Sequence, residues 1–249
     1  MDIVLKQHGR GRATLTLNRP DALNALTPQM LDALSAAIDE AAEDDAVGVI
    51  VITGAGRAFS AGVDLKSLKD RKLVNGAVGP LLDLPGRELI RRIETVPKVV
   101  LARVNGFCFT GALELALACD LIVVAAEAKL GDTHARYGIR PSWGMSQRLP
   151  RRVGVLKAHE LSYTGKTFTG GEAMEMGLAN FAPPLDSLNE VVDELCDQIL
   201  ANSRDTVAAY KDLYRATEGM RLDDGLDYES RIDYVITDTE SRIESFRRR

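Results

Sequence analysis

The sequence predicts an α/β protein, and three observations lead to that prediction. The chain has 249 residues, 45% of them hydrophobic and 27% charged, which is ordinary for a globular protein of one large domain or one domain with a smaller appendage. Strand-like and helix-like segments alternate through the first half. From about Arg151 onward, helical patterns replace this alternation. We therefore expect a βα core with a helical C-terminal part.

The elements of the first half are predicted by their periodicity. Ala13–Leu17 alternates in polarity with a period of two, as a half-buried strand does. A helix is expected to begin at Thr27 and Pro28, because threonine favours the N-cap and proline the first helical position. Nearly continuous apolar runs predict further strands, covered on both faces. These runs lie at Val47–Ile52, Lys98–Ala102 and Leu121–Val124.

The remaining segments are less regular. Asp70–Pro85 has weak periodicity and contains the breakers Gly76, Gly79 and Pro80, so it is the best candidate for a mobile loop. In the C-terminal part, charged residues are mixed with apolar positions at helical spacing, and this part is expected to pack on the core or on a neighbouring subunit. Helices are predicted over Leu188–Leu200, Thr206–Ala216 and Arg231–Phe246.

Composition excludes several classes of protein. A net charge of −5 argues against nucleic-acid binding, which leaves a strongly basic footprint. The three cysteines are odd in number and widely spaced, so neither a disulfide framework nor a cysteine metal site is expected. The N-terminus does not resemble a signal peptide, and no apolar run approaches the roughly 18 residues of a membrane span. We expect a cytoplasmic protein with no membrane or nucleic-acid partner.

Most catalytic signatures are missing from the sequence. Gly54–Phe59 fails the last position of a dinucleotide-binding glycine motif, and there is no P-loop, nucleophile elbow or HExxH motif. The histidines His8, His134 and His159 are too scattered to predict a metal site. We therefore expect neither a metal nor a redox cofactor.

Two glycine-containing segments, Phe59–Lys66 and Asn105–Ala116, follow predicted strands and lead into helix starts. The first N–H groups of a helix have no partner within the helix. Two such loops that meet would direct two N–H donors at one oxygen, as a developing oxyanion requires. The alternative is that the glycines only make tight turns.

Glu114 is the one charged residue between Gly111 and Cys119, in an otherwise apolar helical segment. Burial of such a carboxyl raises its pKa toward the range that is useful for acid–base catalysis. The alternative is a first-turn glutamate on a solvated surface, where it complements the helix dipole.

Four segments in order resemble the crotonase superfamily (enoyl-CoA hydratase/isomerase family) over nearly the whole chain. They are Leu17–Leu26, Ala58–Lys66, Asn105–Asp120 and Gly131–Leu149. The resemblance implies a crotonase (ClpP-like) spiral of ββα units, with an acyl-CoA site in residues 1–190 and a helical trimerisation region in residues 191–249. It also implies a homotrimer or a dimer of trimers.

The substrate implied by the resemblance is an acyl-CoA thioester, with coenzyme A as part of the substrate and no further cofactor. The backbone N–H groups that hold the thioester oxygen fall on Val63 and Gly111. Coenzyme A is expected to lie along a segment with Lys66 near its phosphates, although Asp64 could instead be a structural loop carboxylate. That CoA-binding segment comprises Ala61, Val63, Asp64, Leu65 and Lys66.

Hydratases of the family hold one water between two glutamates, and the resemblance places the first on Glu114. The second position is His134, which is a departure from the family pattern. Histidine can bind a water and exchange a proton near neutral pH, but His134 could equally be a non-catalytic pocket residue. Asp132, two residues earlier, could orient the imidazole, although we favour a surface carboxylate there.

Further departures surround this position. Arg136 and Tyr137 stand where the family usually has apolar residues, and Trp143 either packs in the core or narrows the acyl pocket. We expect a hydratase that adds water to a 2-trans-enoyl-CoA through a thioester enolate. The alternatives are another reaction of the family (isomerisation, C–C bond cleavage or thioester hydrolysis) and a non-catalytic acyl-CoA-binding protein.

Overall fold

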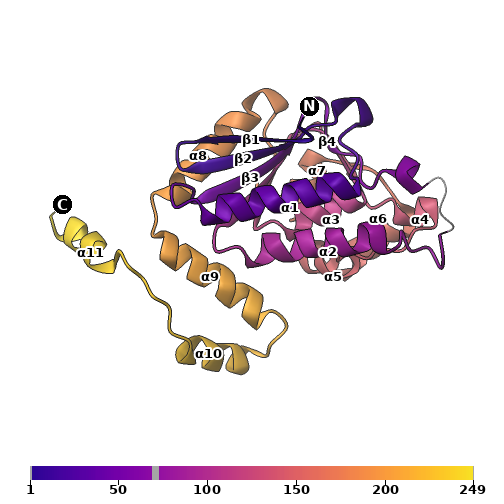
Figure 1. The fold of residues 1–249 in the computed structure, drawn as a ribbon. Coiled ribbons are helices and arrows are strands. Elements are labelled where there is room, and N and C mark those ends of the chain that lie inside the picture. The colour runs from indigo at the N-terminus through magenta and orange to yellow at the C-terminus, as the bar shows by residue number, and fades with distance from the viewer. Residues whose placement is uncertain (1, 69–72, 249) are drawn as a thin grey trace.

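The computed structural model describes residues 2–68 and 73–248, and within these ranges the chain forms two sheets (Figure 1). The larger sheet has the order β1-β2-β3-β5-β7, in which β1 is antiparallel to β2 and the other neighbours are parallel. Its strands are β1 (Val4–Gly9), β2 (Arg12–Leu17), β3 (Val49–Gly54), β5 (Val99–Val104) and β7 (Leu121–Val124). The smaller sheet has the order β4-β6-β8-β9. It consists of β4 (Ala58–Ser60), β6 (Phe107–Phe109), β8 (Lys129–Gly131) and β9 (Phe168–Thr169).

The parallel strands β3, β5 and β7 are each followed by a short strand of the smaller sheet and then by a helix. The units are β3-β4-α2, β5-β6-α3 and β7-β8-α4, and this repetition confirms the predicted spiral of ββα units. Their helices are α2 (Pro80–Thr95), α3 (Gly111–Ala118) and α4 (His134–Tyr137). Because the short strands are neighbours, the three loops that follow them gather at one end of the molecule.

The core follows from the apolar patterns of the sequence. All six residues of β3 are buried, as expected of a strand covered on both faces. Helix α1 (Pro28–Glu43) begins as predicted, because the Thr27 hydroxyl accepts a hydrogen bond from the backbone N–H of Met30 at 3.2 Å. Its apolar face, including Leu34 and Ile38, is buried in the core.

Two features of the N-terminal half differ from the expectations. Strand β1 has no counterpart among the predicted elements, since it lies at the sheet edge and only Val4 among its residues is buried. The predicted mobile loop Asp70–Pro85 is wrong from Pro80 onward, where α2 begins. Proline is accommodated in a first helical turn, so this breaker marks a helix start. Residues 70–72 of that loop lie outside the described residues.

The C-terminal helices agree with the sequence only in part. Helices α8 (Leu188–Leu200) and α9 (Arg204–Thr217) confirm the first two predictions. The third prediction holds only from Thr239 onward, where α11 (Thr239–Arg247) begins. Residues 232–238 separate it from α10 (Leu222–Arg231). In that gap the backbone N–H of Thr237 donates to the Asp205 carboxylate of α9 at 2.7 Å, in place of a helical carbonyl.

The two last helices contain no buried residue and extend away from the core in Figure 1. The other helices are α5 (Met145–Val153), α6 (Val155–Thr164) and α7 (Gly170–Glu175). The predicted boundary at 190/191 falls inside α8, whose Leu188, Val192 and Cys196 are buried. Across the described ranges, no helix combines the length and the apolar character that a bilayer span needs.

Candidate active site

The two glycine-containing loops meet, as expected of an oxyanion site. Gly62 has φ +90°, and a Cβ there would lie 2.6 Å from the carbonyl oxygen of Phe109, so only glycine permits this close approach. A Cβ on Gly111 would lie 3.3 Å from Val63 Cγ2. Within residues 2–68 and 73–248, neither Val63 N–H nor Gly111 N–H donates a hydrogen bond. Two unused donors therefore lie on neighbouring loops.

The turn into α3 is strained at Thr110. This β-branched residue has φ +54° and ψ −113°, a conformation that costs about 1–3 kcal/mol. It is held by a hydrogen bond from its N–H to the Gly131 carbonyl at 3.0 Å and by contact of its hydroxyl with that of Thr133 at 2.5 Å. The strain lies immediately before Gly111, where the chain changes direction from β6 into α3.

Glu114 is buried in α3, with 2% of its surface exposed, so the solvated alternative is wrong. Its Oε1 accepts hydrogen bonds from the backbone N–H groups of Trp143 at 2.9 Å and Met145 at 3.0 Å. Burial raises the pKa of this carboxyl and outweighs the opposing effects of His134 and the two N–H groups. Because both N–H groups donate to Oε1, Oε2 is the oxygen that is left to carry a proton.

His134 lies between two carboxyl groups. Its Nε2 is 3.6 Å from Glu114 Oε2, and its Nδ1 is 2.7 Å from Asp132 Oδ1. Asp132 has only 3% of its surface exposed, so our expectation of a surface carboxylate is wrong. Its other oxygen, Oδ2, accepts a hydrogen bond from the Ser162 hydroxyl of α6 at 2.7 Å. The loop that joins β8 to α4 therefore turns Asp132 inward beneath α6.

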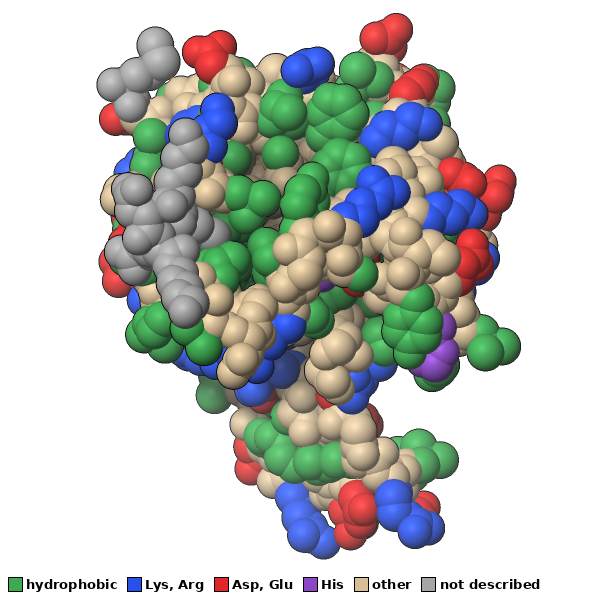
Figure 2. Space-filling view, turned by 90° about the vertical axis from the view of Figure 1, so that its right-hand side faces the viewer, with side chains coloured by type: hydrophobic (Ala, Val, Ile, Leu, Met, Phe, Trp, Pro, Cys, Tyr) green, Lys and Arg blue, Asp and Glu red, His purple; other side chains and the backbone are tan. Residues whose placement is uncertain are grey.

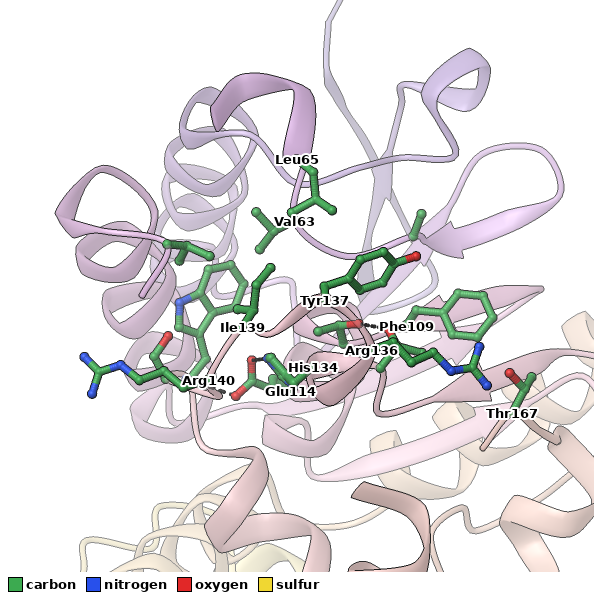
Figure 3. Close-up of a pocket in the computed structure, with 16 residues that line it drawn as sticks. Val63, Leu65, Phe109, Glu114, His134, Arg136, Tyr137, Ile139, Arg140 and Thr167 are labelled. Carbon is green, nitrogen blue, oxygen red and sulfur yellow. Dashed lines mark hydrogen bonds and ion pairs between the residues drawn. The ribbon is translucent and has the colours of Figure 1, made fainter. Parts of the chain in front are cut away.

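A cavity of about 300 Å³ opens beside these groups (Figure 3). Glu114 and His134 lie together on one side of it, and Val63 and Leu65 lie opposite. Hydrophobic side chains gather over the middle of the molecular face that carries α4 and α6, with Lys and Arg side chains around them (Figure 2).

The predicted CoA-binding segment is divided between the cavity and the loop. Ala61, Val63 and Leu65 line the cavity. Asp64 instead accepts hydrogen bonds from the Arg19 guanidinium at 3.1 Å and from the backbone N–H of Lys66 at 3.0 Å. These contacts therefore favour a structural role for the Asp64 carboxylate in the loop.

Trp143 satisfies both of its predicted alternatives, because it is buried and also lines the cavity. Its ring packs against Gly86 of α2, where an added Cβ would lie 2.2 Å from Trp143 Cε2. On the other side it approaches Gly111, where a Cβ would lie 3.1 Å from Trp143 Cζ3. Arg136 and Tyr137 also line the cavity, and both are exposed. The indole ring therefore forms the wall between the cavity and α2.

The comparisons with known proteins agree with this arrangement. A family model described as enoyl-CoA hydratase/isomerase matches residues 8–248. The chain belongs to this family. The superfamily expected from the four sequence segments is thereby confirmed.

Named relatives in the enoyl-CoA hydratase/isomerase family come from distant organisms. The chain is 36% identical to a probable peroxisomal enoyl-CoA hydratase 1 of Arabidopsis thaliana, over 90% of this chain and 81% of that protein. It is 32% identical to a short-chain-enoyl-CoA hydratase of Clostridium acetobutylicum, over 92% of this chain and 87% of the relative. The crystal structure of an enoyl-CoA hydratase from Bacillus anthracis matches with a TM-score of 0.87 at 32% identity, covering 92% of this chain and 88% of that one.

Proposed function

We propose that this protein is an enoyl-CoA hydratase that adds water to a 2-trans-enoyl-CoA. The observation that carries the proposal is the Glu114–His134 pair, buried at a cavity beside the unused N–H groups of Val63 and Gly111. The thioester oxygen accepts hydrogen bonds from these two N–H groups. Negative charge that develops there as the enolate forms is stabilised by preorganised donors, each of which typically contributes about 2.7–4 kcal/mol.

Water is held between Glu114 Oε2 and His134 Nε2, whose separation of 3.6 Å is too long for a direct hydrogen bond. His134 Nε2 takes a proton from the water as its oxygen forms a bond to C3. Glu114, protonated on Oε2, gives its proton to C2. The proton on His134 then returns to Glu114, so the elements of one water are added and the enzyme is restored.

Coenzyme A enters as part of the substrate, along Ala61, Val63 and Leu65, with Lys66 toward its phosphates. We propose no further cofactor and no metal. A cytoplasmic location is part of the same proposal and is tested by cell fractionation.

The proposal includes assembly as a homotrimer or a dimer of trimers through the C-terminal helices. It is supported by α10 and α11, which lack buried residues and expose large apolar side chains, among them Leu222, Leu226 and Phe246. Light scattering after gel filtration should give three or six times the chain mass of 27.1 kDa. A chain that ends after Thr217 should give a smaller assembly, and an unchanged mass would contradict this role of α10 and α11.

The decisive experiment follows the loss of conjugated thioester absorbance with crotonyl-CoA and with a longer 2-enoyl-CoA. Wild type should turn over, and Glu114→Gln and His134→Ala should each lose about 100-fold or more of kcat. Thermal unfolding of each variant shows that the fold is retained. If wild type binds acyl-CoA but consumes no thioester in a panel of acyl-CoAs, the protein is an acyl-CoA-binding protein and not an enzyme of this family. Isomerised, cleaved or hydrolysed products would assign another reaction of the family.

A further inference from the structure

A chain of polar contacts runs from α6 to α3 through the candidate base. It passes from the Ser162 hydroxyl to Asp132 Oδ2 at 2.7 Å and from Asp132 Oδ1 to His134 Nδ1 at 2.7 Å. It then passes from His134 Nε2 to Glu114 Oε2 at 3.6 Å. Glu114 and His134 line the cavity, whereas Asp132 and Ser162 stand behind the imidazole, outside the cavity wall.

The contacts of Asp132 decide which nitrogen of His134 carries the proton. A neutral imidazole has one N–H donor and one acceptor nitrogen, whereas an ionised carboxylate only accepts. A short Nδ1–Asp132 contact therefore requires the hydrogen on Nδ1, which leaves the lone pair on Nε2. In the described part of the chain, Asp132 is the one hydrogen-bond partner of the imidazole ring.

The environment keeps Asp132 in its ionised form. Burial opposes ionisation, but the hydrogen bonds from His134 and Ser162 outweigh it, so the pKa of this carboxyl lies below its ordinary value. Ser162 also occupies Oδ2, and the backbone N–H of His134 approaches Oδ1 at 3.3 Å. Both oxygens are thus engaged, and the carboxylate has little freedom to rotate.

We propose that Asp132 is a positioning residue, which holds His134 in the tautomer whose Nε2 accepts a proton from water, and that Ser162 holds Asp132 in turn. The proposal rests on the hydratase function for its kinetic consequence, but not for the tautomer itself. The other charged or titratable groups around His134 are Glu114 of α3, Arg136 and Tyr137 of α4, and Arg140 after α4. Within the described residues, none of these forms a hydrogen bond with Nδ1.

The test measures the ring ¹⁵N shifts of His134 together with the kinetics. The chain has three histidines, so His134→Ala identifies the His134 signals in histidine-labelled protein. Wild type should show the Nδ1–H tautomer. Asp132→Ala removes both acceptor oxygens, and it should shift His134 toward the Nε2–H tautomer and lower kcat about 100-fold or more. KM should change by no more than a few-fold, because Asp132 does not line the cavity.

A conservative variant separates positioning from simple packing. In Asp132→Asn the backbone N–H of His134 favours the amide oxygen at the Oδ1 position, so the Nδ1–H tautomer and most of the activity lost in Asp132→Ala should return. Ser162→Ala should have a smaller effect than Asp132→Ala. Asp186→Ala makes the same change at an exposed carboxylate and should leave both readouts at wild-type values.

Two outcomes overturn the proposal: an unchanged Nδ1–H tautomer in Asp132→Ala, or a tautomer change with no loss of turnover. If wild type hydrates no enoyl-CoA, the proposed function fails. The ring shifts in wild type and Asp132→Ala then still decide whether Asp132 sets the tautomer.

Discussion

Replacing Gly86 with alanine tests whether Trp143 is held against α2. Gly86 lies inside α2, and the added methyl carbon would lie 2.2 Å from Cε2, 2.4 Å from Cζ2 and 2.6 Å from Nε1 of Trp143. These distances are all shorter than van der Waals contact, so the indole ring has to move. The ring is buried between α2 and Gly111, with 4% of its surface exposed, and it has little room to move without disturbing the cavity.

Two opposing effects set the change in the free energy of unfolding that we expect for Gly86→Ala. Overpacking a core contact typically costs about 1–3 kcal/mol, and three contacts this short place Gly86→Ala in the upper half of that range, at about 2–3 kcal/mol. Alanine gains about 0.8–1.0 kcal/mol over glycine inside a helix. We therefore expect Gly86→Ala to lower the free energy of unfolding by about 1–2 kcal/mol, which corresponds to a fall in Tm of about 2–8 °C for a chain of this size. The kcat should fall as well, because the backbone N–H of Trp143 is a hydrogen-bond donor to Glu114.

The assay is thermal and urea unfolding of Gly86→Ala, Trp143→Phe and the double variant. The smaller ring should relieve the clash and give a coupling energy of about 0.5–3 kcal/mol between the two positions. Gly171→Ala is the control, because its added Cβ would meet no atom nearer than Thr169 Oγ1 at 3.8 Å. If Gly86→Ala is as stable as wild type, Trp143 is not packed on α2 and the reasoning is refuted.

Two further predictions concern buried charge. Glu114→Gln should unfold at a higher temperature than wild type at pH 8, and this difference in Tm should narrow toward pH 4. Burial raises the folded-state pKa of Glu114. The contribution of Glu114 to stability is therefore present below its unfolded-state pKa and is lost as the pH rises through the folded-state value. A gap independent of pH would contradict this. Lys211→Met should lower the free energy of unfolding by about 3 kcal/mol in urea, because Lys211 Nζ contacts the partly buried Asp120 at 2.8 Å and also donates to the carbonyls of Ile93 and Lys98. Lys157→Met, which removes an exposed ion pair, should cost less than about 1 kcal/mol, and equal losses in the two variants would refute the distinction.

Local pattern was sufficient for four strands of the larger sheet and for α1. Strands β2, β3, β5 and β7 carry apolar runs or alternation, and α1 carries a threonine cap before its apolar stripe. The smaller sheet has no comparable signal, because its strands have two or three residues, too few to display a period. Strand β1 was missed because five of its six residues are exposed.

The residues of the candidate site show the same contrast between those with a signal in the local sequence and those without one. Val63, Gly111, Glu114 and His134 were predicted from the resemblance of their segments to the family pattern, and Val63, Glu114 and His134 line the cavity. The two donors to Glu114 Oε1 are backbone groups at positions 143 and 145, and a backbone N–H leaves no trace in the residue type. Asp132 was misjudged because Ser162 lies 30 residues further along the chain and only the fold brings the two together.

The histidine at position 134 changes where negative charge lies in the site. Two glutamates, as the family pattern has them, would both face the substrate. Here burial raises the pKa of Glu114, the carboxyl that faces the cavity, whereas Asp132, whose pKa is lowered, stands behind the imidazole. In the proposed reaction, the atoms that face the substrate are the protonated Oε2 of Glu114 and the acceptor Nε2 of His134. An enolate that forms there in the proposed reaction meets no facing carboxylate charge that would oppose the N–H groups proposed to stabilise it, those of Val63 and Gly111. In the proposed reaction, His134 therefore keeps one acid and one base in the site and leaves the negative charge of Asp132 away from the reacting atoms.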